Sequence, residues 1–301
     1  MVSSGELVLP ANNLVVIIGS PRSGTTFAMR VLQSLPNVAA VSGVVYPATI
    51  PQYIDRLPPE ERGLLVSELR QSLTRYLRSA LHTSRAVGLQ KWWRSGRTPG
   101  RLMQALGRQP VWDTVVYKEP FLSFSPGMIE EALPGVRIVH MIRDGRDCAD
   151  SLVRTYGVLS DEQLASRDGV EVAVSRVWQG RRIPDWLPAG DEKQFLEASP
   201  FVRSVFMWRE MVQKCRSASD SATADGRPFL EVRYEDLMSD PGRTFDRMAQ
   251  FMRVELNGRA RKVLRSAHTQ SIGNHARQSE EDRDRAWRVA GELLESYGYV
   301  R

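Results

Sequence analysis

The chain has 301 residues, with 41 Lys and Arg against 35 Asp and Glu, a formal net charge of +6, and 42% hydrophobic residues. This length and apolar content suffice for one large globular domain or two small ones, and they exclude a disordered chain, a fibre and a disulfide scaffold. The only cysteines, Cys148 and Cys215, lack the paired spacing of a zinc site, so we expect reduced thiols and a cytoplasmic location. The positive charge suggests an anionic ligand or, alternatively, a nucleic acid.

The first predicted element is a strand over residues 14–18. Its continuous run, Leu-Val-Val-Ile-Ile, is typical of a strand buried on both faces of a parallel sheet. The run is too short to cross a bilayer, and residues 1–13 contain no Lys or Arg, so we expect neither a membrane segment nor an export signal. A Gly-Ser-Pro-Arg-Ser-Gly turn follows, and apolar residues at helical spacing predict a helix over residues 25–35.

Strands and helices alternate along the rest of the chain. We predict strands over residues 38–41, 114–118, 136–142 and 229–233, and helices over residues 60–81, 128–133, 147–156, 243–252 and 282–297. This alternation predicts an α/β fold with a central parallel sheet flanked by helices. Together with the loop described next, it predicts a P-loop-type three-layer fold. No linker-like break divides the strands, so we expect a single domain over residues 1–301. A loop-rich acceptor or lid segment is predicted at about 157–200, where no period is sustained.

The turn after the first strand, Gly19-Ser-Pro-Arg-Ser-Gly-Thr-Thr26, has the frame of a P-loop, in which backbone N–H groups and a helix N-terminus hold anionic oxygens. A nucleoside triphosphatase needs a Lys directly after the second glycine, where this chain has Thr25, and the only cationic side chain of the loop is Arg22. The loop therefore predicts a cradle for one 5′-phosphate group, with Arg22 reaching over what that phosphate carries. The cradle would consist of Ser23, Gly24, Thr25 and Thr26. A glycine-rich turn without a ligand is the alternative.

The sequence Pro21-Arg-Ser-Gly-Thr-Thr26 after a buried strand resembles the 5′-phosphosulfate loop of sulfotransferases that use 3′-phosphoadenosine 5′-phosphosulfate (PAPS). It is most similar to the branch that carries PRSGT, which includes many bacterial members. The resemblance implies a second motif, a strand ending in an Arg that is followed eight residues later by a helical Ser. Arg143 and Ser151 supply it, and in the resembled family such a pair holds the 3′-phosphate. An ion pair with Asp144 or Asp147 is the alternative for Arg143.

The C-terminal third carries two looser similarities. Arg233-Tyr-Glu-Asp-Leu237 resembles the YEDL segment that follows a late strand in these enzymes, and residues 271–277 resemble their closing loop beside the nucleotide. The resemblance implies that Arg277 contacts the 3′-phosphate and that Tyr234 neighbours the nucleotide. A buried structural tyrosine is the alternative for Tyr234.

Sulfuryl transfer needs cations over the transferring group and a base for the acceptor proton. The resemblance implies Arg22 for the sulfonate and the leaving phosphate oxygen. Cytosolic sulfotransferases carry a His just after the strand that corresponds to residues 114–118, and tyrosylprotein enzymes carry a Glu after the first helix; this chain has neither. Glu119 is therefore the leading candidate base, with a salt bridge to Lys118 or Arg22 as its alternative. His82 is the second candidate, and Lys118 is a candidate contact of the sulfonate.

Together these features predict a PAPS-dependent sulfotransferase that transfers a sulfuryl group to a hydroxyl or amine of a small-molecule, glycan or lipid acceptor and releases 3′-phosphoadenosine 5′-phosphate (PAP). We expect no metal and no nucleic acid, a bacterial role in secondary metabolism, and a homodimer as the assembly to test. Several aromatic residues either line an acceptor pocket or pack on the core: Trp92, Trp93, Trp178, Trp186 and Tyr156. Two other functions stay open, a P-loop kinase acting on a small molecule and a basic nucleic-acid-binding protein.

Overall fold

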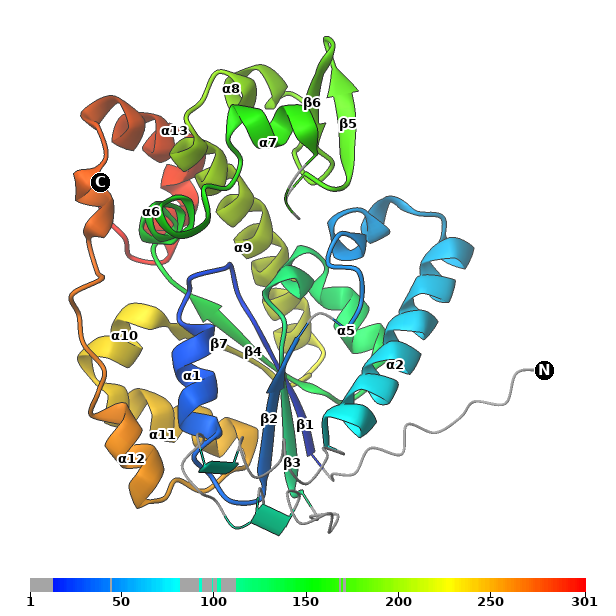
Figure 1. Cartoon of the computed structure of the whole chain (residues 1–301), viewed down its shortest axis with the longest axis vertical. Helices are drawn as coiled ribbons and strands as arrows, with labels where there is room; N and C mark the ends of the chain where they lie inside the picture. Colours follow the sequence, from blue (N-terminus) through cyan, green and yellow to red (C-terminus); the bar gives the residue numbers. More distant parts are fainter. Residues whose placement is uncertain are drawn as a thin grey trace.

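A five-stranded sheet forms the centre of the molecule. The structure is a computed structural model that describes residues 13–43, 45–81, 112–167 and 172–301, together with residues 92, 93, 99, 102, 103 and 169. All pairings in the sheet are parallel, and the strand order is β2-β3-β1-β4-β7 (Figure 1). The strands are β1 Asn13–Ile18, β2 Val38–Ser42, β3 Thr114–Lys118, β4 Arg137–Ile142 and β7 Phe229–Arg233. The predicted α/β fold with a central parallel sheet is confirmed, and each predicted strand is correct to within one residue at its ends.

Strand β1 lies in the middle of this sheet because its side chains serve two cores. Val15 and Ile17 belong to the cluster on one face, and Val16 and Ile18 belong to the cluster on the other, and all four have no exposed surface. Because the strands are parallel, their carboxyl ends meet at one edge of the sheet, and the turns that follow β1, β3 and β4 converge there.

Helices cover both faces of the sheet (Figure 1). One face packs against α1 Thr25–Leu32, α10 Tyr234–Ser239, α11 Pro241–Met252 and α12 Gly258–Leu264. The opposite face packs against α2 Pro59–Leu81 and α5 Pro126–Ala132. Helix α1 ends three residues earlier than predicted, because the N–H groups of Ser34 and Leu35 bond to the carbonyls three residues before them in a tight turn. The predicted three-layer arrangement is therefore observed.

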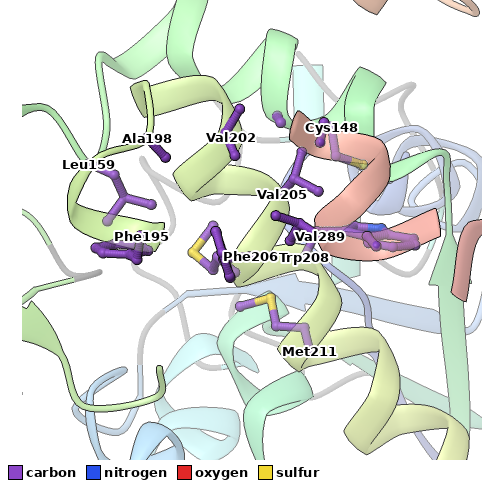
Figure 2. Packing of buried hydrophobic residues seen from close by; sticks show 14 of the residues in the cluster. Cys148, Leu159, Phe195, Ala198, Val202, Val205, Phe206, Trp208, Met211 and Val289 are labelled. Carbon is purple, nitrogen blue, oxygen red and sulfur yellow. The ribbon is translucent and has the colours of Figure 1, made fainter. Parts of the chain in front are cut away.

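The helix α9 Pro200–Ala224 was not predicted from the sequence, although it organises the second half of the chain. It begins at Pro200, where the hydroxyl of Ser199 accepts a hydrogen bond from the Val202 N–H. Its apolar face packs on α6 Gly145–Tyr156 and α13 Glu280–Ser296. Figure 2 shows this core, in which Val205 and Trp208 of α9 lie beside Cys148 of α6 and Val289 of α13.

The described residues of the segment 157–200 form packed elements beyond the carboxyl ends of the strands (Figure 1). These are α7 Asp161–Ser166, the antiparallel hairpin of β5 Ser175–Trp178 and β6 Arg181–Pro184, and α8 Glu192–Leu196. Leu159, Trp186 and Phe195 are buried in the same cluster as α9. The segment therefore has regular structure where loops were predicted, and its role as an acceptor-binding or lid segment stays a prediction.

Single-turn helices complete the fold. They are η1 Ile50–Gln52, η2 Ile54–Arg56, η3 Pro120–Phe124 and η4 Asn274–Arg277. The first three follow β2 or β3 and so flank the carboxyl edge of the sheet. Within the described ranges, no helix combines the length and the apolar character needed to cross a bilayer.

Candidate active site

The phosphate loop between β1 and α1 has a backbone that only glycine can supply at two positions. Gly19 has a φ of +146°, and a Cβ there would lie 2.3 Å from the Met141 carbonyl oxygen. Gly24 has a φ of +93°, and a Cβ there would lie 2.4 Å from Cδ2 of Tyr234. The Gly19 N–H donates to the buried hydroxyl of Ser123 at 2.8 Å, which ties the loop to η3. The two glycines of the motif are therefore required by close approach of the backbone to its neighbours.

The residues after Arg22 form a cradle at the start of α1. Ser23 is fully buried, and its hydroxyl has no hydrogen-bond partner among the described residues. Thr25 is buried and Thr26 is exposed in the first turn of the helix. The first N–H groups of a helix have no intrahelical partner, and they carry the positive end of the helix dipole. A buried hydroxyl without a partner, next to such a helix start, fits an anionic oxygen.

Arg22 joins the phosphate loop to helix α6. Its φ is +73°, an uncommon backbone conformation for a residue other than glycine. Its Nε donates to the Ser151 hydroxyl at 2.9 Å, and its Cζ lies 5.9 Å from the ring centroid of the exposed Tyr156. The two predicted motifs therefore meet directly, although 129 residues separate Arg22 from Ser151 in the chain.

Arg143, at the end of β4, is buried with 5% of its surface exposed. Its guanidinium donates to the carbonyls of Arg22 and Ser271, and its Cζ lies 4.5 Å from the ring centroid of Tyr234. Its Nε has no hydrogen-bond partner among the described residues. The alternative of an ion pair holds in part, because Nη2 lies 3.7 Å from Asp147, whereas Asp144 pairs with Arg146 instead.

The C-terminal motif residues lie on the same side of the loop. Tyr234 begins α10, is 8% exposed, and shares a hydrogen bond of 2.8 Å with the Ser271 hydroxyl. Arg277 is exposed at the end of η4. Asp147 accepts hydrogen bonds from the N–H groups of Gly273 and His275. The structure thus brings Arg22, Ser23, Gly24, Arg143, Ser151 and Tyr234 together at one edge of the sheet.

Glu119 follows β3 at the same edge and is 8% exposed. Its Oε1 accepts a hydrogen bond of 3.1 Å from the Phe121 N–H at the start of η3. Burial raises the pKa of its carboxyl, and the Phe121 hydrogen bond and the nearby charge of Lys118 lower the pKa by less. Glu119, Lys118 and Arg22 all lie in the described residues, and there Glu119 bonds to the Phe121 N–H and Arg22 to Ser151, without the salt bridge that was the alternative for Glu119. Lys118 is half-buried at the end of β3.

Other predicted residues take different places. His82, with residues 83–91, lies outside the described residues. Trp186 is 2% exposed and packs between Phe124 and Phe195, so it belongs to the core. Tyr156 is 60% exposed beside Arg22. In the described part of the chain, no group of three or more His, Cys, Asp or Glu side chains is arranged to hold a metal ion.

Comparison with known proteins identifies the family. A family model described as "Sulfotransferase family" matches residues 15–197, which is more than half of the chain. The chain belongs to the sulfotransferase family. Enzymes of this family take the sulfuryl group from PAPS. The match includes the phosphate loop and the Arg143 to Ser151 motif, and it ends before Tyr234 and the closing segment.

Solved structures of other sulfotransferases are similar to this sulfotransferase at low identity. The sulfotransferase domain of the Synechococcus PCC 7002 olefin synthase is 16% identical, with a TM-score of 0.48, and the match covers 97% of this chain and 96% of that chain. A sulfotransferase from Alicyclobacillus acidocaldarius is 16% identical, with a TM-score of 0.47, and the match covers 96% of each chain. A mouse sulfotransferase complexed with PAP is 12% identical, with a TM-score of 0.46, and the match covers 94% of this chain and 85% of that chain. No curated protein sequence matches the chain.

The residues of the phosphate loop fit the donor of this family. Among the described residues, the Ser23 hydroxyl and the Arg143 Nε have no hydrogen-bond partner, and both are buried polar atoms that an anionic ligand would satisfy. Gly24 lets the ring of Tyr234 lie against the backbone beside this cradle.

Sequence reasoning missed several residues that support the site of this sulfotransferase. The indole N–H of Trp208 donates to the Arg143 carbonyl at 3.0 Å, and its ring lies where a Cβ at Gly145 would be. Glu235 accepts a hydrogen bond from the Asp144 N–H at 3.0 Å. Both fix the backbone that presents Arg143. The Ser199-Pro200 cap followed by apolar residues at helical spacing was the signal for α9, and hence for Trp208.

Proposed function

We propose that this sulfotransferase transfers the sulfuryl group of PAPS to a hydroxyl or amine of a small-molecule, glycan or lipid acceptor. The hydrogen bond between Arg22 and Ser151 carries the proposal. It joins the loop proposed to hold a 5′-phosphate to the helix proposed to hold a 3′-phosphate. PAPS carries phosphate groups at both of these positions, so it fits two such sites side by side.

Each group of residues has a proposed role toward the nucleotide. Ser23, Gly24, Thr25 and Thr26 hold the 5′-phosphosulfate through hydroxyl and backbone N–H groups. Arg143 and Ser151 hold the 3′-phosphate, Tyr234 lies beside the nucleotide, and the exposed Arg277 reaches the 3′-phosphate from the closing segment. The burial of Arg143 supports its role, because its Nε has no partner in the described part of the chain, and a buried guanidinium with such an N–H interacts strongly with an anion.

The proposed reaction is an in-line transfer. The acceptor oxygen or nitrogen forms a bond to sulfur while the bond between sulfur and the oxygen of the 5′-phosphate breaks, and PAP leaves with that oxygen. The proton of the acceptor passes to the Glu119 carboxylate. The guanidinium of Arg22, with the half-buried Lys118 as a second cation, stabilises the charge on the sulfonate and on the leaving phosphate oxygen.

The surroundings of Glu119 support its role as the base. Burial raises its pKa above the ordinary Glu value, which brings a carboxylate closer to the range in which it accepts a proton efficiently. Burial raises the pKa of the neighbouring Tyr76 and Tyr117 phenols, and the charge of Glu119 raises it further. These phenols donate to the carbonyls of Ser42 and Gly43 and so hold the end of β2 near Glu119. His82 stays the second candidate base.

We propose a single domain in which the acceptor binds between the segments that follow β2 and β3 and the segment of residues 157–200.

We infer a bacterial enzyme of secondary metabolism that acts in the cytoplasm. Cys148 and Cys215 are free and buried, which is consistent with a reducing compartment. Sedimentation of the purified chain would test the proposed homodimer.

A thermal-shift titration with PAP against adenosine 5′-phosphate tests the donor. We expect PAP to raise the melting temperature at concentrations at which adenosine 5′-phosphate has no effect, because only PAP carries the 3′-phosphate. Equal shifts would contradict the proposed use of PAPS. Magnesium-dependent hydrolysis of a nucleoside triphosphate would favour a small-molecule kinase instead. Affinity for nucleic acid that moderate salt abolishes, with no effect of PAP, would favour a nucleic-acid-binding protein.

A further inference from the structure

Two buried acidic residues on α6 hold the segment of residues 271–278, which we call the closing segment. Asp147 is 1% exposed and Asp150 is 3% exposed. They lie three positions apart on the helix and so share one of its faces. The proposed reaction assigns neither of them a role.

Asp147 receives most of its hydrogen bonds from the closing segment. Its Oδ2 accepts the Gly273 N–H at 2.8 Å, and its Oδ1 accepts the His275 N–H at 3.0 Å. The Nδ1 of His275 also lies 2.9 Å from Oδ1. A buried carboxylate is unfavourable unless such donors surround it. Burial raises the pKa of Asp147, but the hydrogen bonds of His275 and Gly273 and the charge of Arg143 outweigh burial, so the pKa lies below its usual value.

The closing segment is fastened at both ends. At its start, the Ser271 carbonyl accepts from Arg143, and the Ser271 hydroxyl shares a hydrogen bond with Tyr234. At its end, the Gln278 amide donates to Asp150 at 2.8 Å. Asp147 holds the middle, where Gly273 has a φ of +78° that lets the chain turn into η4. The position of the segment is thus coupled to two groups that we assign to the nucleotide.

We propose that Asp147 is a positioning residue that keeps the closing segment docked on α6 and thereby presets the 3′-phosphate side of the nucleotide site, with Asp150 as a weaker second anchor. The inference rests on the proposed function. A segment that is already ordered loses less conformational freedom when the nucleotide binds, so docking by Asp147 favours affinity for the nucleotide rather than the chemical step.

Hydrogen exchange of the nucleotide-free chain tests the docking directly. In Asp147→Asn, amides of residues 271–278 should exchange about tenfold faster or more, while amides of the phosphate loop stay unchanged, because only the segment has lost its anchor. Asp246→Asn is the matched control, since Asp246 is an exposed acid that pairs with Arg261 at 3.2 Å. Unchanged exchange of the closing segment in Asp147→Asn would overturn the proposal.

Ligand binding separates a positioning role from a general structural role. Asp147→Asn should weaken PAP about 10- to 30-fold and adenosine 5′-phosphosulfate by no more than about twofold, because only PAP uses the 3′-phosphate side. The KM for PAPS should rise while kcat stays within about twofold. Asp150→Ala should weaken PAP about threefold, because it removes the acceptor of one hydrogen bond that the neutral Gln278 amide donates. Equal loss of both ligands in Asp147→Asn would contradict the proposal.

A second variant covers the case in which Asp147→Asn does not fold. His275→Ala removes the Nδ1 contact and leaves both backbone N–H groups, so PAP should weaken about threefold with the melting temperature preserved; an unchanged affinity for PAP would count against the proposal. If the wild-type chain does not bind PAP, the proposed function fails, and the exchange measurement still judges the docking. If the wild type binds PAP and Asp147→Asn binds it equally well, only the positioning role fails.

Discussion

The proposed nucleotide side and the proposed acceptor side of the sheet edge are built differently. On the proposed nucleotide side, two adjacent strands, β1 and β4, each end in a short turn that leads into a helix. Arg143 at the end of β4 donates to the Arg22 carbonyl of the first turn, and the Arg22 side chain donates to Ser151 of α6. On the proposed acceptor side, the segments after β2 and β3 contact the segment that follows α6: Arg56 pairs with Asp185 at 3.1 Å, and Phe124 stacks on Trp186, which is buried in the core of α9. The first side is defined by backbone geometry and charge, and the second by packing.

This difference explains why the proposed nucleotide side could be predicted from the sequence and the proposed acceptor side could not. A phosphate group has one shape and charge, so the turn that binds it needs particular residues at particular positions, such as Gly24 against Tyr234. Packing on the acceptor side needs only side chains that are apolar and of suitable volume. Trp186 was equally compatible with a pocket or a core before its neighbours were known.

The largest expected effect tests whether Trp186 belongs to the core or to an acceptor pocket. Trp186→Ala should reduce the free energy of unfolding by about 3–5 kcal/mol, because its ring stacks on Phe124 and meets Phe195 edge to face. Leu64→Ala, at a site on α2 that is 73% exposed, should change it by less than about 0.5 kcal/mol. Urea unfolding measures both. Unchanged stability with a raised acceptor KM in Trp186→Ala would move Trp186 into the pocket.

The second effect concerns the proposed base. Glu119→Gln should reduce turnover at least about a hundredfold and leave the affinity for PAP nearly unchanged, because the amide cannot accept the acceptor proton. Glu210→Gln is a control of equal burial on α9, and its turnover per folded molecule should stay within about threefold. Steady-state kinetics and calorimetry check these values, and near-normal turnover in Glu119→Gln would eliminate it as the base.

The third effect sharpens the assignment of the 3′-phosphate. Arg143→Ala should weaken PAP about 30-fold, and Ser151→Ala about fivefold, because a charge-assisted hydrogen bond contributes more than a neutral one. Adenosine 5′-phosphosulfate should lose less than about twofold in both variants. Arg261→Ala, which removes an exposed ion pair, is the control. Calorimetric titration measures the affinities of these variants for both ligands. A similar loss of affinity for PAP and for adenosine 5′-phosphosulfate would refute the assignment.

A fourth effect is a dependence of the rate on pH. Because burial raises the pKa of Glu119, kcat/KM should climb about tenfold per pH unit on the acid side and level off above a pKa higher than that of an ordinary Glu. The residual activity of Glu119→Gln should lack this rise of kcat/KM with pH, the acid limb of the profile. A limb that persists unchanged in the variant would assign it to another group.

The smallest effect is on stability. The pKa of Glu119 is raised in the folded chain, so its ionisation favours unfolding as the pH rises past the carboxyl range. Glu119→Gln should therefore gain unfolding free energy relative to the wild type at pH 8, and the gain should vanish below the unfolded pKa of Glu. Thermal unfolding across this range measures it, and a variant that is less stable at pH 8 would show that the carboxylate is stabilised where it lies.

The sequence by itself determined the elements whose signal is local. Buried strands such as β1 read as continuous β-branched runs, because both faces of a central strand are covered. The phosphate loop was recognisable because its glycines, hydroxyls and cation are the groups needed to bind one small anion, and they stand at the expected spacing. The pairing of Arg143 with Ser151 followed from a resemblance in spacing, and the family match includes both residues.

Only the tertiary structure decided how distant segments support that site. Trp208 reaches the Arg143 carbonyl from α9, and Asp147 holds Gly273 from α6, a separation of 126 residues. No local pattern encodes such contacts, because they depend on which surfaces the helices bury against one another. The residues of the phosphate loop are consecutive in the sequence, so their pattern can be recognised locally. The burial that orients Arg143 and raises the pKa of Glu119 arises only when the layers of the fold pack together.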